Sequence, residues 1–147
     1  MLGKNKKEER ILLISTKGRY ALRVMVDIAE NCGDGYLSLK DIAGRQEISM
    51  KYLEMIIGSL AKENLLLSRR GKTGGYMLSK PAKDYTVYEI LAAAEDGITP
   101  TACPSLEGEI CEREDSCTTF PLWKKLNTVI EDYLKNVSLK DLVNGTV

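Results

Sequence analysis

Three cysteines lie close together in the C-terminal half of the chain: Cys103, Cys111 and Cys117, separated by seven and five residues. Thiolates are favoured ligands of zinc and of iron–sulfur clusters, and both usually take four protein ligands. The spacing differs from the paired C-x-x-C of a zinc ribbon, and long spacers leave room for a bulkier cofactor. The residues alone leave four roles open: an iron–sulfur cluster, zinc, a thiol switch and inert cysteines.

The chain contains no histidine, and this limits what can complete such a site. The fourth ligand must be an oxygen donor, a thiol from elsewhere, a group from a second subunit or water. Acidic residues crowd the cysteines and offer oxygen ligands, although solubility is their simpler role: Glu107, Glu109, Glu112, Glu114 and Asp115. Without a histidine, or a nucleophile beside an evident base, catalysis has little support, and no enzyme activity is predicted. The fourth cysteine, Cys32, is expected to be a small core residue.

Length and charge bound the class of protein. The 147 residues suffice for one domain, or one domain with an appendage. Residues 1–80 carry 15 Lys and Arg against 9 Asp and Glu, whereas residues 81–147 carry 6 against 12. A basic front half suits a polyanionic partner, although ordinary variation in surface charge gives the same split.

The chain is expected to be cytoplasmic. No apolar run approaches the roughly 18 residues that span a membrane, and Met1 to Arg10 lack the apolar core of a secretory signal. In the cytoplasm thiols stay reduced, so a cysteine cluster more often binds metal or acts in redox chemistry than forms disulfides.

The front half shows the pattern of a winged helix-turn-helix. Apolar periodicity and capping residues predict three helices, over residues 15–30, 38–46 and 49–64. The second and third are joined by a tight turn, which is typical of a helix-turn-helix. Residues 65–68 and 76–78 predict two strands around a basic, glycine-rich loop. A hairpin that directly follows a helix-turn-helix is a wing.

The rear half predicts a linking helix and a long terminal helix. Thr86 with Glu89 forms a capping box for a helix that ends near Glu95, and Pro121 fits the first turn of a helix to about residue 136. This last helix has more apolar residues than a small domain can cover, so we expect it to pack on a second subunit. Ser138 with residue 141 caps one further turn.

These elements predict a mainly α fold: a winged helix-turn-helix with a small β-hairpin wing and a long C-terminal dimerisation helix. The expected division is a flexible tail, the DNA-binding domain, the linking helix, the cysteine loop, and the dimerisation helix with its final turn: 1–11, 12–82, 83–99, 100–120 and 121–147.

The helix that begins at Ser49 is the candidate recognition helix. A helix N-terminus in the major groove brings hydroxyls and cations to phosphates and base edges. Glu54 would repel DNA unless it accepts from a cytosine amino group; otherwise it is a solvated surface residue. An arginine at the wing tip can enter a narrow minor groove. The residues predicted to contact DNA are Lys17, Arg19, Ser38, Ser49, Met50, Lys51, Tyr52, Glu54, Arg69, Arg70, Lys72, Thr73, Gly74 and Gly75.

An ordered set of short motifs along residues 12–144 supports this interpretation. The motifs are Ser15-Thr16-Lys17-Gly18-Arg19-Tyr20-Ala21, Ile48-Ser49, Tyr52-Leu53-Glu54, Arg70-Gly71, Gly74-Gly75-Tyr76, the three cysteines, Leu122-Trp123, Leu139 and Leu142-Val143-Asn144. Together they resemble the IscR-type regulators, the iron–sulfur-responsive branch of the Rrf superfamily of bacterial winged-helix transcription factors.

The resemblance implies a homodimer that binds a double-stranded DNA operator, with helix 121–136 at the interface. It implies that Cys103, Cys111 and Cys117 hold a 2Fe–2S cluster, that Glu54 restricts operator choice and that Arg70 enters the minor groove. Members of this family usually control their own cluster-assembly operon, and cluster loss changes their choice of DNA; repressor is the role expected here, although the sequence does not separate repression from activation. Iron–sulfur assembly proteins are candidate cluster donors.

Two departures from the family separate this chain from its best-known members. The family places a histidine three residues after the third cysteine, where this chain has Phe120, and the first two cysteines lie further apart here. We therefore predict an oxygen donor or another unusual fourth ligand. Other branches sense nitric oxide through a 4Fe–4S cluster, respond to thiol state or bind a partner enzyme without a cluster, and these remain the alternatives.

Overall fold

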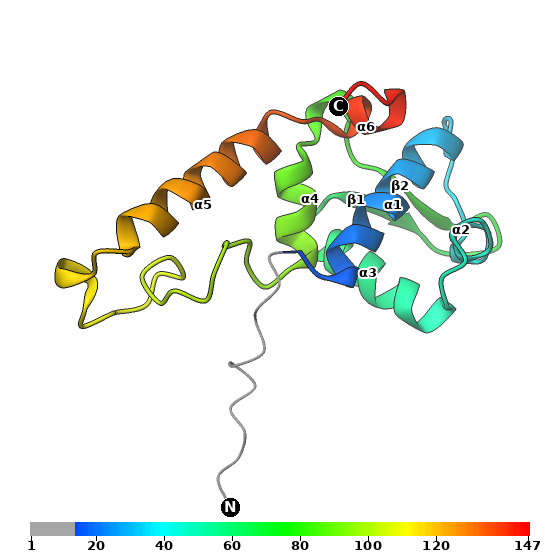
Figure 1. The fold of residues 1–147 in the computed structure, drawn as a ribbon. Coiled ribbons are helices and arrows are strands. Elements are labelled where there is room, and N and C mark those ends of the chain that lie inside the picture. The colour runs from blue at the N-terminus through cyan, green and yellow to red at the C-terminus, as the bar shows by residue number, and fades with distance from the viewer. Residues whose placement is uncertain (1–13) are drawn as a thin grey trace, which may run out of the picture.

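A computed structural model describes residues 14–147; the expected tail, 1–11, and the predicted start of the DNA-binding domain at residue 12 lie outside them. The helices and strands follow in the order α1 Thr16–Asn31, α2 Leu39–Gln46, α3 Met50–Lys62, β1 Leu66–Arg69, β2 Gly75–Leu78, α4 Val87–Ala94, α5 Phe120–Lys135 and α6 Leu139–Asn144 (Figure 1). Short 3-10 turns lie at Ala82–Asp84 and Glu114–Ser116. The predicted fold class, mainly helical with one antiparallel hairpin, is confirmed.

Hydroxyl side chains begin most of the helices, as their positions in the sequence predict. The Oγ of Ser49 accepts from the backbone N–H of Tyr52 at 3.2 Å. Equivalent bonds of 3.0–3.4 Å start four other helices, from Ser15, Ser38, Thr86 and Ser138. Each bond satisfies one of the backbone donors that a helix N-terminus leaves unpaired. At α4 the predicted partner in the capping box, Glu89, instead forms an ion pair with Lys80 at 2.6 Å.

One apolar core joins α1, α2, α3 and α4. Met25, Ile42, Leu53 and Ile90 are inaccessible to solvent and lie one on each of these helices. Such interdigitated side chains fix the helices relative to one another because close-packed interiors tolerate little displacement. Cys32, expected in the core, is half-buried at the end of α1 and packs against this cluster.

A buried carboxylate orients the turn between α2 and α3. Asp27, only 2% exposed, accepts from Arg45 Nε at 2.9 Å, from Arg45 Nη2 at 2.7 Å and from Gln46 Nε2 at 2.9 Å. Hydrogen bonds to both carboxylate oxygens make its burial tolerable. Glu47 follows with φ 54°, a left-handed conformation that ends α2 and turns the chain towards α3.

The wing is fixed to the body by a short third segment. In the β1–β2 hairpin Arg69 lies opposite Gly75, and Leu37 exchanges two backbone hydrogen bonds of 2.8 Å with Tyr76. Gly75 has φ 147°, and a Cβ there would overlap the carbonyl group of Leu37. A glycine is therefore required where the wing meets the segment before α2.

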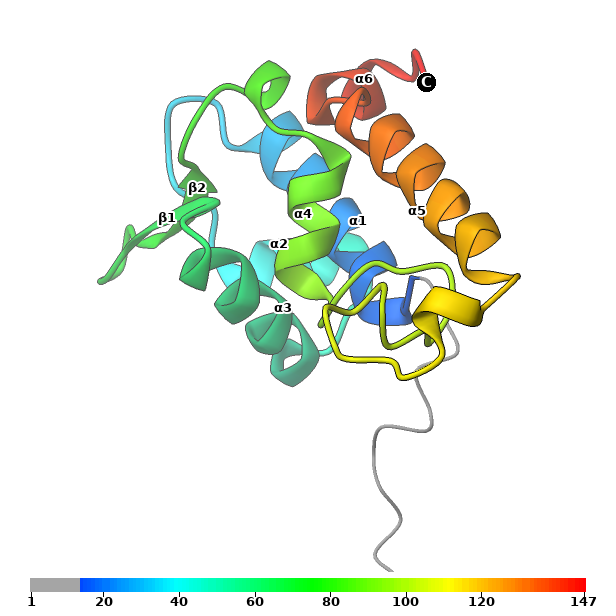
Figure 2. The ribbon, with the colours of Figure 1, turned by 90° about the vertical axis from the view of Figure 1, so that its left-hand side faces the viewer.

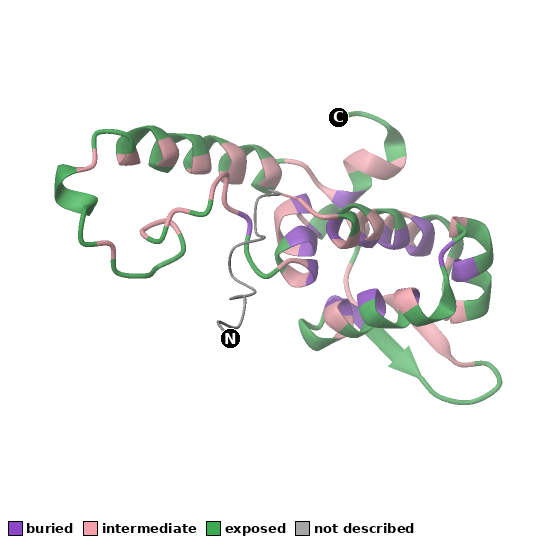
Figure 3. Cartoon of the chain, turned by 60° about the horizontal axis from the view of Figure 1, so that its bottom comes forward, coloured by how far each residue is buried: buried purple, intermediate pink, exposed green. Residues whose placement is uncertain are grey.

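The chain leaves the body after α4 and returns to the same helix. We call residues 96–136, which contain the cysteines and α5, the arm. After the arm, Val87 donates its backbone N–H to Val137 at 2.8 Å, and Leu139 donates to Tyr85 at 3.0 Å. None of the residues of α5 is buried, in contrast to the helices of the body (Figure 3). The arm therefore begins and ends on α4.

Candidate DNA-binding surface and cysteine loop

The buried side of α3 leaves its first turns open to solvent. Leu53, Ile56 and Leu60 are in the core, whereas Lys51 and Glu54 are exposed. In the part of the chain that the structure describes, neither of these two charged groups has a side-chain partner. Their charges are consequently available to an external ligand such as DNA.

The start of α1 lies beside α3 and adds further cations. Lys17 donates to Ser59 Oγ on α3 at 2.8 Å. The ring of Tyr20 meets that of Tyr52 edge to face at 5.9 Å, and the guanidinium of Arg19 lies 5.8 Å from the centre of the Tyr20 ring. Burial, and then the neighbouring Tyr20 and Glu95, raises the pKa of Tyr52, so its hydroxyl stays protonated. The structure thus brings three predicted DNA-contacting residues, Lys17, Arg19 and Tyr52, to one region.

In the wing, two adjacent arginines have different surroundings. Arg69 lies over the ring of Tyr36 at 4.4 Å and donates from Nη2 to the carbonyl oxygen of Thr73 at 2.9 Å. Arg70 and Lys72 are exposed and make no side-chain interaction within residues 14–147. Arg69 therefore braces the hairpin, and the two other cations are free to reach a polyanion.

The remaining predicted DNA contacts have roles in local structure. Ser38 and Ser49 cap α2 and α3, and Met50 is 43% exposed at the first turn of α3. Thr73, Gly74 and Gly75 form the return of the hairpin.

The three cysteines of the arm lie in one loop between α4 and α5. Each is half-buried and none forms a disulfide. The carbonyl oxygens of Cys103 and Cys111 accept backbone hydrogen bonds from Glu107 and Glu114, at 3.2 Å each, within tight turns. The Sγ of Cys117 lies 3.4 Å from Thr119 Oγ1. Hydrogen bonds from Thr119, first its side chain and then its backbone, lower the pKa of the Cys117 thiol.

The donor set of this loop fits a cluster, although the side chains are not gathered around one point. Three unpaired thiols and several carboxylates lie on the same connection, which is the chemistry that an iron–sulfur cluster with one oxygen ligand needs. Within residues 14–147, no three cysteine, aspartate or glutamate side chains converge as ligands of a single metal ion would.

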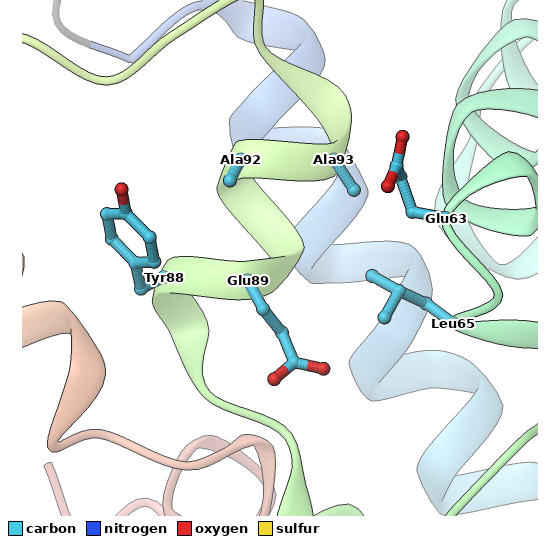
Figure 4. A pocket seen from close by; sticks show the side chains of 6 residues that line it. All are labelled: Glu63, Leu65, Tyr88, Glu89, Ala92 and Ala93. Carbon is cyan, nitrogen blue, oxygen red and sulfur yellow. The ribbon is translucent and has the colours of Figure 1, made fainter.

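A separate hollow of about 460 Å³ lies between α4 and the turn that joins α3 to β1 (Figure 4). Glu63 and Leu65 line one side, and Tyr88, Glu89 and Ala93 line the α4 side. It includes neither the predicted DNA contacts nor the cysteines.

Among residues 14–147, none of the helices has the length and apolar character needed to cross a membrane.

A helix-turn-helix followed by a braced wing, with free cations on both, defines a winged-helix DNA-binding protein. Residues 14–145 match the Rrf2 family, described as iron-dependent transcriptional regulator, and the chain belongs to this family. It is a DNA-binding transcription regulator, and its predicted resemblance to the IscR-type regulators is confirmed.

The similar proteins include IscR regulators and a cysteine regulator. The chain is 40% identical over 132 residues to the HTH-type transcriptional regulator IscR of Pectobacterium carotovorum subsp. carotovorum (strain PC1), covering 90% of this chain and 79% of that protein. The structure of T. potens IscR matches with a TM-score of 0.71 and 35% identity, covering 92% and 89% of the two chains. CymR, the global cysteine regulator of B. subtilis, matches with a TM-score of 0.75 and 34% identity, covering 92% and 99%.

The structure also shows contributors that the sequence does not reveal. Tyr36 holds Arg69, Ser59 holds Lys17, and Glu95 bonds to Ser15 across 80 residues. No local pattern marks such pairs, because each forms only when separate elements pack together.

Proposed function

We propose that this protein is a homodimeric, operator-binding regulator. An iron–sulfur cluster in the arm would alter which operators it binds, or how tightly it binds them. The observation that carries the proposal is the loop of three unpaired thiols, Cys103, Cys111 and Cys117, attached to a winged-helix domain of the Rrf2 family. A 2Fe–2S cluster and control of cluster-assembly genes are the specific form that we propose.

The DNA side of the proposal rests on the unpaired charges of α3 and the wing. Lys51 and Lys72 would meet phosphates, and Arg70 would enter the minor groove. Glu54 would accept from a cytosine amino group and penalise sites that lack one. A carboxylate in this position lowers affinity for most sequences, so its effect is on selectivity.

The proposal of a dimer is supported by an uncovered apolar stripe along α5. Leu122, Leu126, Val129 and Tyr133 are 59%, 38%, 55% and 59% exposed. They recur at intervals of four, three and four residues, which is the spacing of a coiled-coil seam. A stripe of this kind is stable in water when a second copy of α5 covers it.

On the arm, Cys103, Cys111 and Cys117 would hold the cluster through their thiolates, with an acidic side chain as the fourth ligand. When bound, such a group supplies sensitivity to iron, oxygen and the capacity for cluster assembly. The protein would couple cluster binding to DNA binding. If one arrangement of the loop holds the cluster better, cluster binding favours that arrangement and so changes the population of dimers that can bind DNA.

The first test is oxygen-free purification, followed by visible spectroscopy and by measurement of iron and sulfide per chain. We expect a 2Fe–2S spectrum from the wild-type protein and none from a variant with alanine at all three arm cysteines, which should still fold and dimerise. Cys32→Ala is the matched control and should keep the colour. A wild-type protein that stays colourless after reconstitution would overturn the cluster proposal.

Thiol sensing is the second candidate. It is favoured by the similarity to CymR, the global cysteine regulator of B. subtilis, over 92% of the chain. If this candidate is right, peroxide changes operator affinity in colourless wild-type protein and not in the variant that lacks the arm cysteines. A 4Fe–4S spectrum would instead favour the nitric oxide branch.

A further inference from the structure

The carboxylate of Glu95 joins the root of the arm to the first turn of α1. Glu95 is the residue at which α4 ends, and its backbone N–H makes the last hydrogen bond of that helix, 2.8 Å to Leu91. Its Oε1 accepts from both the backbone N–H of Ser15, at 2.7 Å, and the Oγ of Ser15, at 2.8 Å. Hydrogen bonds to a charged acceptor are stronger than those between neutral groups, and this pair is half-buried.

The two helices approach one another closely at this point. Gly18 is buried in the first turn of α1, and a Cβ at this position would overlap the carboxylate of Glu95. Ile14 and Ile98 pack with Leu91 in a small second core at the same place. Ile14, just before the cap of α1, and Ile98, the first apolar residue of the arm, therefore belong to one apolar cluster. Figures 1 and 2 both show the start of α1 beside the end of α4.

The partner of Glu95 is also the cap of a helix that carries DNA-facing cations. The Oγ of Ser15 accepts from Gly18 N–H at 3.4 Å, and its carbonyl oxygen accepts from Arg19 N–H at 3.1 Å. Lys17, between them, reaches Ser59 on α3. A shift of Ser15 therefore moves the start of α1 relative to the recognition helix.

The topology makes Glu95 the point at which the arm begins. The arm leaves α4 after Glu95 and returns to the other end of that helix through the hydrogen bond between Val87 and Val137. A rearrangement of the cysteine loop can consequently act on the body at both ends of α4, and the Glu95 end is hydrogen-bonded to the residue that caps α1.

We propose that Glu95 is a positioning residue that couples the state of the cysteine loop to the DNA-facing start of α1 through its bonds to Ser15. This inference rests on the proposed function, because the state of the loop is its occupancy by the cluster. In this role Glu95 acts through Ser15 and is assigned neither as a cluster ligand nor as a DNA contact. It sets how strongly the occupancy of the cysteine loop alters the affinity for the operator. Such couplings typically correspond to about 5- to 150-fold in affinity.

The test compares operator affinity of loaded and cluster-free protein, and takes the ratio as the coupling. Glu95→Ala should bring a wild-type ratio of about tenfold or more close to one. Glu89→Ala is the matched control: it removes another carboxylate of α4, which pairs with Lys80 and not with α1, and should keep the wild-type ratio. Hydrogen exchange provides a second readout, because the first amides of α1 should change protection on loading in the wild-type protein and not in Glu95→Ala.

A pair of substitutions at Ser15 approaches the contact from the other side. Ser15→Thr keeps the hydroxyl and should keep the coupling, whereas Ser15→Ala removes the hydroxyl bond, leaves the backbone bond and should reduce the coupling. A coupling that is equal in these two variants would count against the contact even if Glu95→Ala does not fold. A wild-type ratio above one that Glu95→Ala leaves unchanged would overturn the role of Glu95 while cluster control stands. A wild-type ratio of one would overturn cluster control itself, and the coupling with it.

Discussion

Arg69 and Arg70 are adjacent in the wing, but only Arg70 has a guanidinium that is free in the described part of the chain. Arg69 is held by Tyr36 and by the carbonyl oxygen of Thr73. We therefore expect Arg70→Ala to reduce operator affinity by about 5- to 150-fold, the effect of losing one groove contact, with no change in thermal stability. Arg69→Ala should lower stability as well, because it unbraces the hairpin. Equal losses of affinity from both variants at unchanged stability would contradict these separate roles.

Glu54 is a residue whose removal should improve binding to the wrong sites. Because a carboxylate is repelled by phosphates, Glu54→Ala should tighten binding to operators that lack the preferred cytosine and narrow the gap between good and poor sites by about 1–3 kcal/mol. Titrations against single-base operator variants would measure this gap. Lys51→Ala is the control, since loss of a phosphate contact should weaken all sites alike and reduce the salt dependence. An unchanged ranking of sites in Glu54→Ala would remove the role assigned to this residue.

At individual positions, the sequence predicts exposure better than it predicts partners. Lys51, Glu54, Arg70 and Lys72 are exposed as expected, since helix periodicity and turn composition locate surface positions. Lys17 was expected to contact DNA, and the structure adds its bond to Ser59, 42 residues away. Such a contact depends on how α1 crosses α3, and this crossing is decided by packing of the whole core.

At the scale of elements, local signals were sufficient for the helices and the hairpin. Capping residues begin α1, α2, α3, α4 and α6 where they were expected, and boundaries differ by one or two residues. The cysteine loop follows no such rule. Its 96–119 connection contains only one short 3-10 turn, so neither periodicity nor caps could indicate how its thiols are arranged.

The last helix, α6, should be sensitive to acid. Asp141 accepts from both the backbone N–H and the Oγ of Ser138, at 2.9 and 2.8 Å, and these bonds lower its pKa below the ordinary value of 3.8. A carboxyl whose folded-state pKa is depressed stabilises the fold above its unfolded pKa and loses this contribution as pH falls through the folded pKa. We expect Asp141→Asn to destabilise the protein more at pH 7 than at pH 3.

Denaturant unfolding at a series of pH values measures this difference. Asp34→Asn, in the exposed turn after α1, removes the same charge without breaking a cap and serves as the control. The inaccessible Leu139 begins α6, so fraying of this helix should also be visible as faster exchange of the amides that pair residues 85–87 with 137–139. Parallel pH curves for wild-type protein and Asp141→Asn would contradict the capping role.

At the scale of the molecule, a basic winged-helix body carries an acidic arm. Residues 1–80 hold the excess of Lys and Arg, and the arm contains most of the acidic residues of the rear half. Since repulsion keeps the acidic loop away from phosphates, the arm should influence DNA through the body and not by direct contact. This arrangement is suited to a regulator in which sensing and DNA reading occur on different surfaces.

The uncovered stripe of α5 provides the decisive test of assembly. Val129→Glu places a charge in the centre of the proposed seam and should give a monomer by sedimentation, because a buried unpaired carboxylate is strongly unfavourable. Thr128→Glu adds the same charge to a neighbouring exposed residue outside the stripe and should remain dimeric. Both variants should retain the body, since no residue of α5 is buried in it. Loss of the second half-site contact should then weaken operator binding by about 100-fold or more, and a Val129→Glu protein that stays dimeric would place the interface elsewhere.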